Sequence, residues 1–207
     1  KGVYRAYDFD TPRADEPAPR GYEAFCLSHH GRHGSRFLYN QAEYDTLNLV
    51  LNREHLTAFG EMVRDKFNEN YPILKGRAAD LTELGQKQHR LLARRMMADY
   101  PHLFRKGSEV HAFSSDRTRC MMSMYNFLDE LRLCTKGLDI HADYNSAYLK
   151  YLRAQHPEPF DMKGFLRDNF DPQSLFERLF ASPEKAMAST DPWNFSQELY
   201  YYASHLD

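Results

Sequence analysis

The feature that most constrains this chain is the stretch Arg32-His33-Gly34-Ser35-Arg36 and the short apolar run before it. The run covers residues 24–27 (Ala-Phe-Cys-Leu), and polar residues and Gly31 lead from it into the stretch. This order predicts a buried strand that ends in a loop. Glycines suit a backbone that turns sharply and approaches a ligand closely. The sequence therefore predicts a loop that presents a histidine between two arginines.

The residue types in this loop match the needs of phosphoryl transfer. Arginine meets phosphate oxygens with a planar fork of donors and stays charged at any working pH. A neutral imidazole is a competent nucleophile, and a phosphohistidine intermediate divides one difficult displacement into two easier ones. Positioning and preorganised positive charge supply the remaining catalysis. The alternative is a basic surface loop with a chance histidine; the preceding apolar run and Arg36 favour the functional interpretation.

The motif Arg-His-Gly-x-Arg at residues 32–36 resembles the signature of the histidine phosphatase superfamily, in its acid phosphatase and phytase branch. The mutase-like branch usually has another residue type at the position of Arg36. The lead-in at residues 27–31 and the following Phe37-Leu38 are most similar to bacterial multiple inositol polyphosphate phosphatases. Many members carry a proline shortly after the second arginine, and its absence here is interpreted as subfamily variation.

This resemblance implies an α/β fold: a three-layer α/β/α core, of which this chain holds the N-terminal part, followed by the start of an inserted helical cap. We assign residues 1–23 to an extended arm, because they are polar and contain scattered Pro and Gly. Residues 24–140 are assigned to the core and residues 141–207 to the cap. The resemblance also leads us to expect a periplasmic or secreted protein. The remainder of the same protein is expected to complete the fold.

Hydrophobic periodicity and capping residues place the other elements. The segment 42–71 is predicted to be mostly helical with Gly60 as a possible break, and residues 72–79 to be a linker. A helix is predicted after Thr82 as N-cap, ending near Tyr100. The other predicted elements are a strand at 109–115, a helix after it capped by oxygens of residues 114–116, and helices at 145–155, 172–181 and 192–204. No strand is predicted after residue 143.

The resemblance also assigns the site residues. It implies that His33 is the nucleophile and that Arg32, Arg36 and a third arginine bind the phosphoryl oxygens. The family has a Ser-Ser…Arg-x-x-x-Ser segment at a helix start, and residues 114–123 fit it with Arg119 as the arginine. A helix N-terminus itself favours anions. Arg117 is interpreted as a solvated residue. No metal or cofactor is expected, because three guanidiniums supply the positive charge.

A second family motif is expected outside this sequence. Hydrolysis of an alkyl phosphate needs a general acid beside the leaving oxygen. In the family that acid belongs to a His-Asp or His-Ala-Glu motif after the cap, which we expect beyond residue 207. His141-Ala142-Asp143 looks similar but does not come after the cap, so we interpret it as a linker and leave it out of the site.

Composition excludes several other classes of protein. An apolar content of 42% supports a real core, and a net charge of −2 argues against a strongly basic nucleic-acid binder. No apolar run approaches the roughly 20 residues of a membrane span. The three cysteines are odd in number and lack metal-type spacing, which argues against a disulfide framework. His29 and His33 have the spacing of a helical metal pair, but Gly31 and Gly34 argue against a helix there.

Two interpretations of function follow. The first is a phosphomonoesterase that acts through a phosphohistidine, with a small phosphomonoester as substrate and inositol polyphosphate favoured by the resemblance. The second is a catalytically weak phosphate-binding protein that has the arginines without a working acid. A mutase-like transferase is disfavoured by Arg36. The basic face at residues 89–95 is interpreted as the solvated side of an amphipathic helix rather than a nucleic-acid site.

Overall fold

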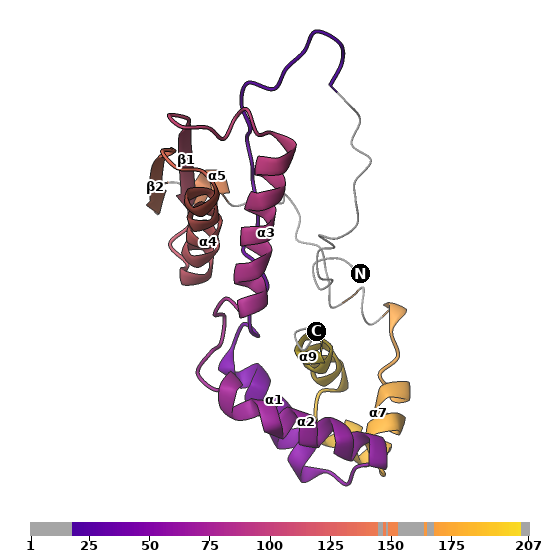
Figure 1. The fold of residues 1–207 in the computed structure, drawn as a ribbon. Coiled ribbons are helices and arrows are strands. Elements are labelled where there is room, and N and C mark those ends of the chain that lie inside the picture. The colour runs from indigo at the N-terminus through magenta and orange to yellow at the C-terminus, as the bar shows by residue number, and fades with distance from the viewer. Residues whose placement is uncertain (1–17, 145–146, 148, 153–163, 165–167, 204–207) are drawn as a thin grey trace. The chain divides into compact units, whose positions relative to one another are not determined.

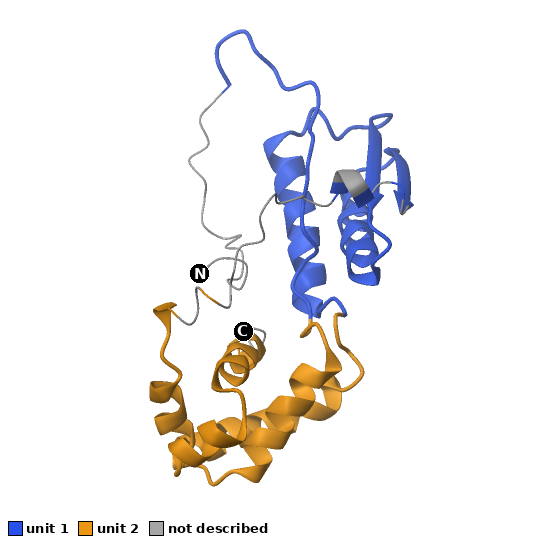
Figure 2. Ribbon diagram, turned by 180° about the vertical axis from the view of Figure 1, so that it is seen from behind, with its two compact units in different colours: residues 1–36, 80–155 blue, residues 37–79, 156–207 orange. Residues whose placement is uncertain are grey.

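The computed structural model describes residues 18–144, 147, 149–152, 164 and 168–203, and these divide into two compact units. Figure 2 shows the first unit, drawn from residues 1–36 and 80–155, in blue. The second, from residues 37–79 and 156–207, is orange. The chain thus leaves the first unit after Arg36 and returns to it at Asp80. Most of the predicted arm at 1–23 lies outside the described residues.

The first unit is built on a β–α–β arrangement (Figure 1). Strand β1 (Glu109–Ser114) pairs in parallel with β2 (Asp139–Tyr144), and α4 (Thr118–Cys134) connects them. Helix α3 (Glu83–Asp99) packs along α4, and a short helix, α5 (Leu149–Leu152), follows β2. The predicted α/β class is confirmed. The carboxyl end of β1 leads directly to the start of α4, the edge at which parallel sheets place ligand sites.

Side chains along β1 and β2 alternate between an inward and an outward face, and the inward ones form part of the core of this unit. Val110 and Ala112 of β1 and Ile140 of β2 face inward and pack against the buried Leu128 and Leu131 of α4. The other face of the strands is exposed, and its residues are mostly polar (Glu109, His111, Phe113, Asp139, His141 and Asp143). Leu128 and Leu131, on the face of α4 that covers the strands, are fully buried.

Strand β2 corrects the prediction of a linker at residues 141–143. Residues His141, Ala142 and Asp143 pair in register with His111, Ala112 and Phe113 of β1. The parallel ladder satisfies the main chain, and the alternate inward positions are apolar, which is the pattern of a strand covered on one face. The predicted boundary at 140/141 falls inside this strand. The division into a core and a cap stays a prediction.

The apolar run at residues 24–27 is not a strand in this structure. The backbone there has no ladder partner among the described residues, and the Phe25 side chain is 94% exposed. A strand is stable only when neighbouring strands take up its N–H and C=O groups and cover its side chains. His102 Nε2 lies 2.7 Å from the Ala24 carbonyl oxygen, and the imidazole N–H donates to it.

The second unit is helical. Its elements in Figure 1 are α1 (Gln41–Arg53), α2 (Ala58–Leu74), α7 (Gln173–Leu179), α8 (Pro183–Ser189) and α9 (Pro192–Ala203). Its buried apolar core is contributed by all five of these helices and by Leu38 and Phe180, which lie outside them. The largest fully buried side chains are aromatic or leucine (Tyr44, Phe67, Phe176, Phe180, Phe195, Leu38, Leu47, Leu51 and Leu179). Helix α8 was not predicted.

The connection between α1 and α2 pairs with the end of α7. Leu56 and Phe180 form an isolated antiparallel bridge, and Ala181 N–H donates to the His55 carbonyl at 2.8 Å. Thr57 N–H donates to the Leu179 carbonyl at 2.9 Å. These bonds join parts of the chain more than a hundred residues apart, so the second unit depends on both of its segments.

Gly60 and Pro72 correct two predictions for this region. The helical break falls at residues 54–57, and Gly60 lies in the first turn of α2. A Cβ at position 60 would collide with the carbonyl group of Leu179, so this glycine permits close packing of α2 against the end of α7. Pro72, expected in a linker, lies within the last turn of α2, which extends to Leu74.

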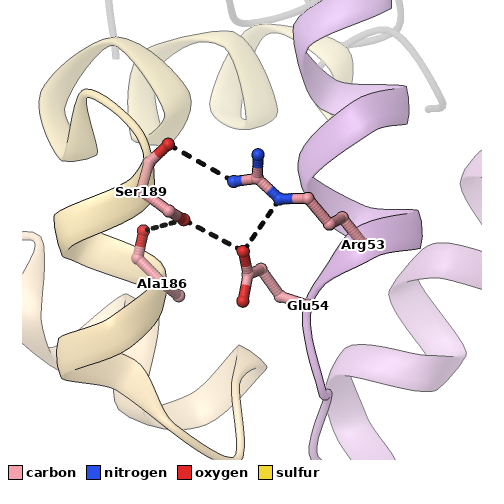
Figure 3. A network of polar contacts seen from close by, with 4 residues as sticks. All are labelled: Arg53, Glu54, Ala186 and Ser189. Carbon is pink, nitrogen blue, oxygen red and sulfur yellow. Dashed lines mark hydrogen bonds and ion pairs between the residues drawn. The ribbon is translucent and has the colours of Figure 1, made fainter.

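A polar network joins the end of α1 to the end of α8 (Figure 3). Arg53 Nε lies 3.0 Å from Glu54 Oε1, and Arg53 Nη2 donates to the Ser189 carbonyl at 3.3 Å. The Ser189 hydroxyl also contacts Glu54 Oε1 at 3.0 Å. Burial alone would raise the pKa of Glu54, but the hydroxyl of Ser189 and the guanidinium of Arg53 outweigh it and lower that pKa.

Two helix starts have a side-chain cap, and a third lacks the cap that was predicted for it. Thr82 caps α3 by accepting from Gly85 N–H at 3.1 Å, as predicted. Asp191 accepts from the backbone N–H groups of Trp193 and Asn194 at the start of α9. The start of α4 has no side-chain cap, because Arg117 is its N-cap residue.

In the described part of the chain, no helix is both long and apolar enough for a membrane span.

Candidate active site

The predicted nucleophile loop, residues 31–36, is fixed against the start of α3. The carbonyl oxygen of Ser35 accepts from Thr82 N–H at 2.9 Å and from the Thr82 hydroxyl at 3.0 Å. The N–H of Ser35 donates to Gln88 Oε1 at 2.8 Å. Both main-chain groups of Ser35 are therefore satisfied by α3. The start of α3 thus acts as a support for the loop.

Two glycines allow the loop and α3 to approach each other. A Cβ at Gly34 would lie 2.7 Å from the Gly85 Cα and would collide with its carbonyl oxygen. A Cβ at Gly85 would lie 2.9 Å from Ser35 N and would collide with the Ser35 carbonyl oxygen. Real side chains do not make contacts this short. Glycine is therefore required at both positions by close backbone contact, rather than by an unusual φ angle.

Helix α4 holds the loop from another side through Ser123. The Ser123 hydroxyl accepts from Gly34 N–H at 3.1 Å and donates to the Arg119 carbonyl at 2.8 Å. The side chain is well buried, with the residue 3% exposed. One hydroxyl thus links the residue after His33 to the residue predicted as the third phosphate-binding arginine.

The structure brings the four predicted site residues together. The pKa of His33 is lowered, chiefly by burial; the hydrogen bond to the Gly34 carbonyl opposes this, and the positive charges of Arg32, Arg119 and Arg36 lower it further. Arg119 lies in the first turn of α4, as predicted. Arg36 forms an antiparallel bridge with Leu81, just before α3. The roles of these residues stay predictions, but their proximity is a finding.

The hydrogen bond of His33 determines which of its nitrogens is available. Nδ1 lies 2.8 Å from the Gly34 carbonyl oxygen, which can only accept. Nδ1 therefore carries the proton, and in the neutral imidazole the lone pair lies on Nε2. Because the lowered pKa favours the neutral form, Nε2 is available as a nucleophile at neutral pH and somewhat below it.

His89 belongs to this region, although the sequence interpretation placed it on a solvated face. It is half-buried, and burial lowers its pKa to about 4, with further lowering by His29 and His33. The backbone of Arg32 acts in the other direction and raises this pKa. The sequence contained a signal for this position. His89 lies four residues, or about one helical turn, after Gly85, so the two residues share one face of the helix.

Other residues of the basic face are held by α4. Arg90 Nε donates to Asn126 Oδ1 at 2.9 Å, and Arg94 Nε contacts Glu130 Oε1 at 2.6 Å. Asn126 and Glu130 are buried, so these side chains serve the packing of α3 on α4. Arg90 and Arg94 are themselves exposed, in agreement with the predicted solvated face, although their guanidinium groups bond to buried acceptors on α4.

The remaining histidines of interest lie in different surroundings. The His29 ring stacks on Phe127 with centroids 6.1 Å apart. His141 stacks on His111 across the two strands, on the exposed face of the sheet. Within the part of the chain that the structure describes, no group of three or more His, Cys, Asp or Glu side chains is placed to hold a metal ion.

Comparison with models of protein families identifies the family to which this chain belongs. The profile of the histidine phosphatase superfamily (branch 2) matches residues 31–149, which is more than half of the chain. The chain belongs to the histidine phosphatase superfamily, branch 2. Among curated proteins, none matches the chain.

The match begins at Gly31 and includes the nucleophile loop, α3, β1, α4 and β2. Membership confirms the resemblance at the level of the superfamily and supports a phosphatase-type activity in general. In a histidine phosphatase, an imidazole surrounded by arginines is the arrangement expected for binding a phosphoryl group.

Proposed function

We propose that this protein is a phosphomonoester hydrolase that acts through a phosphohistidine at His33. The observation that carries the proposal is the electrostatic environment of that side chain: Arg32, Arg36 and Arg119 all act on the pKa of one half-buried imidazole. Three guanidiniums at one nucleophile suit a dianionic phosphoryl group, whose charge shifts onto its oxygens in the transition state.

The proposed reaction has two displacements. In the first, Nε2 of His33 attacks phosphorus, the bond between phosphorus and the ester oxygen breaks, and the leaving alkoxide takes a proton from a general acid. In the second, a water molecule gives a proton to the deprotonated general acid and attacks phosphorus, the phosphorus–nitrogen bond breaks, and inorganic phosphate leaves with His33 and the acid both restored. Arg32, Arg36 and Arg119 hold the three non-bridging oxygens throughout. The general acid is proposed to belong to a His-Asp or His-Ala-Glu motif of the kind that the family carries after its cap.

The substrate that we favour is an inositol polyphosphate such as phytate. This part of the proposal rests on the similarity of residues 27–31 and 37–38 to multiple inositol polyphosphate phosphatases. A substrate of that kind carries several phosphates, so its binding should weaken with ionic strength more than the binding of a simple monoester does.

The test is mass spectrometry of the full-length protein, quenched in alkali after brief mixing with phytate. We expect a phosphoryl adduct that maps to His33 and is lost in His33→Ala. His111→Ala is the control, because that histidine lies on the exposed face of β1 and should leave the adduct intact. The same time course with p-nitrophenyl phosphate separates the general activity from the preference for phytate.

Two results would contradict the proposal. Absence of an adduct, together with no phosphate release between acidic and neutral pH, would indicate a catalytically weak phosphate-binding protein. An adduct on a different histidine would reject His33 as the nucleophile. If p-nitrophenyl phosphate reacts well and phytate does not, the phosphatase activity stands and the substrate assignment is wrong.

A further inference from the structure

We propose that Gln88 of α3 is a positioning residue for the nucleophile and acts on His33 through one peptide group, the one that joins Gly34 to Ser35. This inference rests on the proposed function, in which Nε2 of His33 attacks phosphorus. Gln88 is not itself a reacting group: its effect comes from two hydrogen bonds at opposite ends of that peptide group.

The two hydrogen bonds share a single planar unit. Gln88 Oε1 accepts from the N–H of Ser35 at 2.8 Å. At the other end of the unit, the carbonyl of Gly34 accepts from the Nδ1–H of His33, also at 2.8 Å. A peptide group is planar and resists twisting about its C–N bond, so an acceptor that fixes its N–H also fixes the direction of its carbonyl. Gln88 therefore determines where the acceptor of the His33 imidazole lies.

The neighbouring peptide groups are held by other residues. The N–H of Gly34 belongs to the preceding peptide group and donates to the Ser123 hydroxyl at 3.1 Å. The carbonyl of Ser35 belongs to the following one and accepts from the N–H and the hydroxyl of Thr82 at 2.9 and 3.0 Å. Loss of the Gln88 acceptor would therefore release the peptide group to which His33 is bonded, while the groups on either side of it stay fixed.

These bonds also indicate how the loop divides its work. The N–H groups of Gly34 and Ser35 are both occupied by side chains, one from α4 and one from α3. They serve to hold the loop, and binding of the phosphoryl oxygens is left to the arginine side chains. A change at Gln88 should therefore affect the reactivity of His33 more than the affinity of the site for phosphate.

The chemistry of a carboxamide suits this position. Hydrogen bonds in series polarise one another, so the bond from Ser35 N–H to Gln88 makes the Gly34 carbonyl a better acceptor. A better acceptor at Nδ1 favours the tautomer whose lone pair lies on Nε2 and makes that nitrogen more basic. The bond to the Gly34 carbonyl acts in this direction on the pKa of His33, against burial. A neutral amide provides the effect without placing a charge beside the arginines.

The test compares two substitutions of Gln88 with a matched control in the full-length protein. Gln88→Met has a similar length but only a weakly accepting sulfur, and Gln88→Glu keeps the acceptor oxygen. Gln41→Met is the control, because Gln41 Oε1 accepts from another backbone N–H, that of Gly76, at 2.9 Å in the second unit. Nitrogen NMR of the imidazole without substrate gives the ratio of the two neutral tautomers of His33. Rapid mixing with p-nitrophenyl phosphate gives the rate of His33 phosphorylation.

We expect Gln88→Met to lower the ratio of the Nδ1–H to the Nε2–H tautomer and to slow phosphorylation, each roughly tenfold, as the loss of one hydrogen bond implies. Affinity for inorganic phosphate should change much less. Gln88→Glu is compared by NMR alone, because its charge would also act on phosphate, and it should keep the wild-type ratio. Such rescue would not follow from a role in packing alone. Gln41→Met should match wild type in both readouts.

Three results would overturn the inference. Either a wild-type tautomer ratio or a wild-type phosphorylation rate in Gln88→Met would show that the bond to Ser35 does not act on the nucleophile. A ratio that falls as far in Gln88→Glu would show that the acceptor oxygen is not what matters, and the same fall in Gln41→Met would show that the effect is not specific to the loop. If wild type forms no adduct on His33, the proposed function fails, and the tautomer ratio still decides whether Gln88 positions the imidazole.

Discussion

Ser123 contacts two parts of the candidate site at once. Its hydroxyl accepts from Gly34 N–H at 3.1 Å and donates to the Arg119 carbonyl at 2.8 Å, so it fixes the distance between the loop and α4. Substitution by alanine leaves the part-buried N–H of Gly34 without this acceptor. We expect Ser123→Ala to lower the free energy of unfolding by about 1–3 kcal/mol.

The same substitution should slow phosphorylation of His33, because the nucleophile loop and the third arginine then move relative to each other. Ser108→Ala is the control: the Ser108 hydroxyl only accepts from Arg105 N–H, at 3.3 Å, away from the loop. Both variants are measured by urea unfolding and by the burst of p-nitrophenol. An effect of Ser123→Ala on stability without any effect on the burst would reject Ser123 as a link between the two parts of the site.

At the scale of the element, the packing of α3 against the loop gives a prediction in which two effects oppose each other. Alanine in place of a helical glycine favours an isolated helix by about 0.8–1.0 kcal/mol. At Gly85, however, the added Cβ collides with the backbone of Ser35, which cannot move as a flexible side chain does. We expect the collision to dominate, so Gly85→Ala should be destabilising and should abolish most of the phosphorylation of His33.

Lys87→Ala is the matched control on α3, because Lys87 is exposed and two residues away. It should leave both the thermal midpoint and the rate of phosphorylation unchanged. Circular dichroism separates the two effects on Gly85→Ala, since helix content should be kept while activity is lost. A Gly85→Ala protein with wild-type activity would show that the loop does not pack on α3 as closely as the structure has it.

Helix α9 holds a buried carboxyl group with an unusual pKa. Glu198 is 5% exposed, and its Oε2 has no hydrogen-bond partner in the described part of the chain. Burial raises the pKa of Glu198 to about 7; the hydrogen bond from Asn194 opposes this, and the charges of Glu43 and Asp191 raise it further. The carboxyl group is therefore largely protonated below neutral pH.

The sign of the pH dependence follows from this raised pKa. Between the ordinary glutamate value and about 7, the folded protein binds a proton that the unfolded chain has lost, so stability falls as pH rises through this range. Glu198→Gln should remove that loss and stabilise the second unit at pH 8 by on the order of 1–3 kcal/mol. Thermal unfolding from pH 5 to pH 8 measures it, with the exposed Glu184→Gln as control. Parallel pH profiles for wild type and Glu198→Gln would contradict the prediction.

The limits of sequence-based prediction also lie at the scale of elements. Helix α3 and strand β1 were predicted correctly, because Thr82 marks a start and the apolar periodicity is clear. Strand β2 was missed because its alternation is short and its outward positions are charged or histidine, so only pairing with β1 makes it a strand. The apolar run at 24–27 failed for the opposite reason: its composition suits a strand, but no strand in the described chain pairs with it.

For the site, the sequence motifs identified the chemical groups, and the structure showed which other residues hold these groups in place. Arg32, His33 and Arg36 are consecutive or nearly so, and the resemblance of residues 114–123 to the family's segment at a helix start identified Arg119. The supporting contacts of Gln88 and Ser123 are between segments far apart in the sequence. Such contacts leave no local pattern, so a single sequence could not assign them a role.

At the scale of the whole molecule, the two units should respond differently to phosphate. Each has its own apolar core, and the four predicted site residues all belong to the first unit. A ligand that binds only the folded state stabilises by RT ln(1 + [L]/Kd), about 2.7 kcal/mol at a concentration of 100 Kd. The single tryptophan, Trp193, lies in α9 of the second unit, so its fluorescence reports on that unit alone.

We therefore expect inorganic phosphate to raise the calorimetric unfolding temperature of the first unit while the tryptophan transition moves little. Sodium chloride at equal ionic strength controls for screening. Arg119→Gln should abolish the phosphate effect, and Arg132→Gln, at the other end of α4, should keep it. If both transitions rise together in wild type, the two units unfold as one cooperative system. If neither rises, the arginines around His33 do not bind phosphate, and the proposed function loses its physical basis.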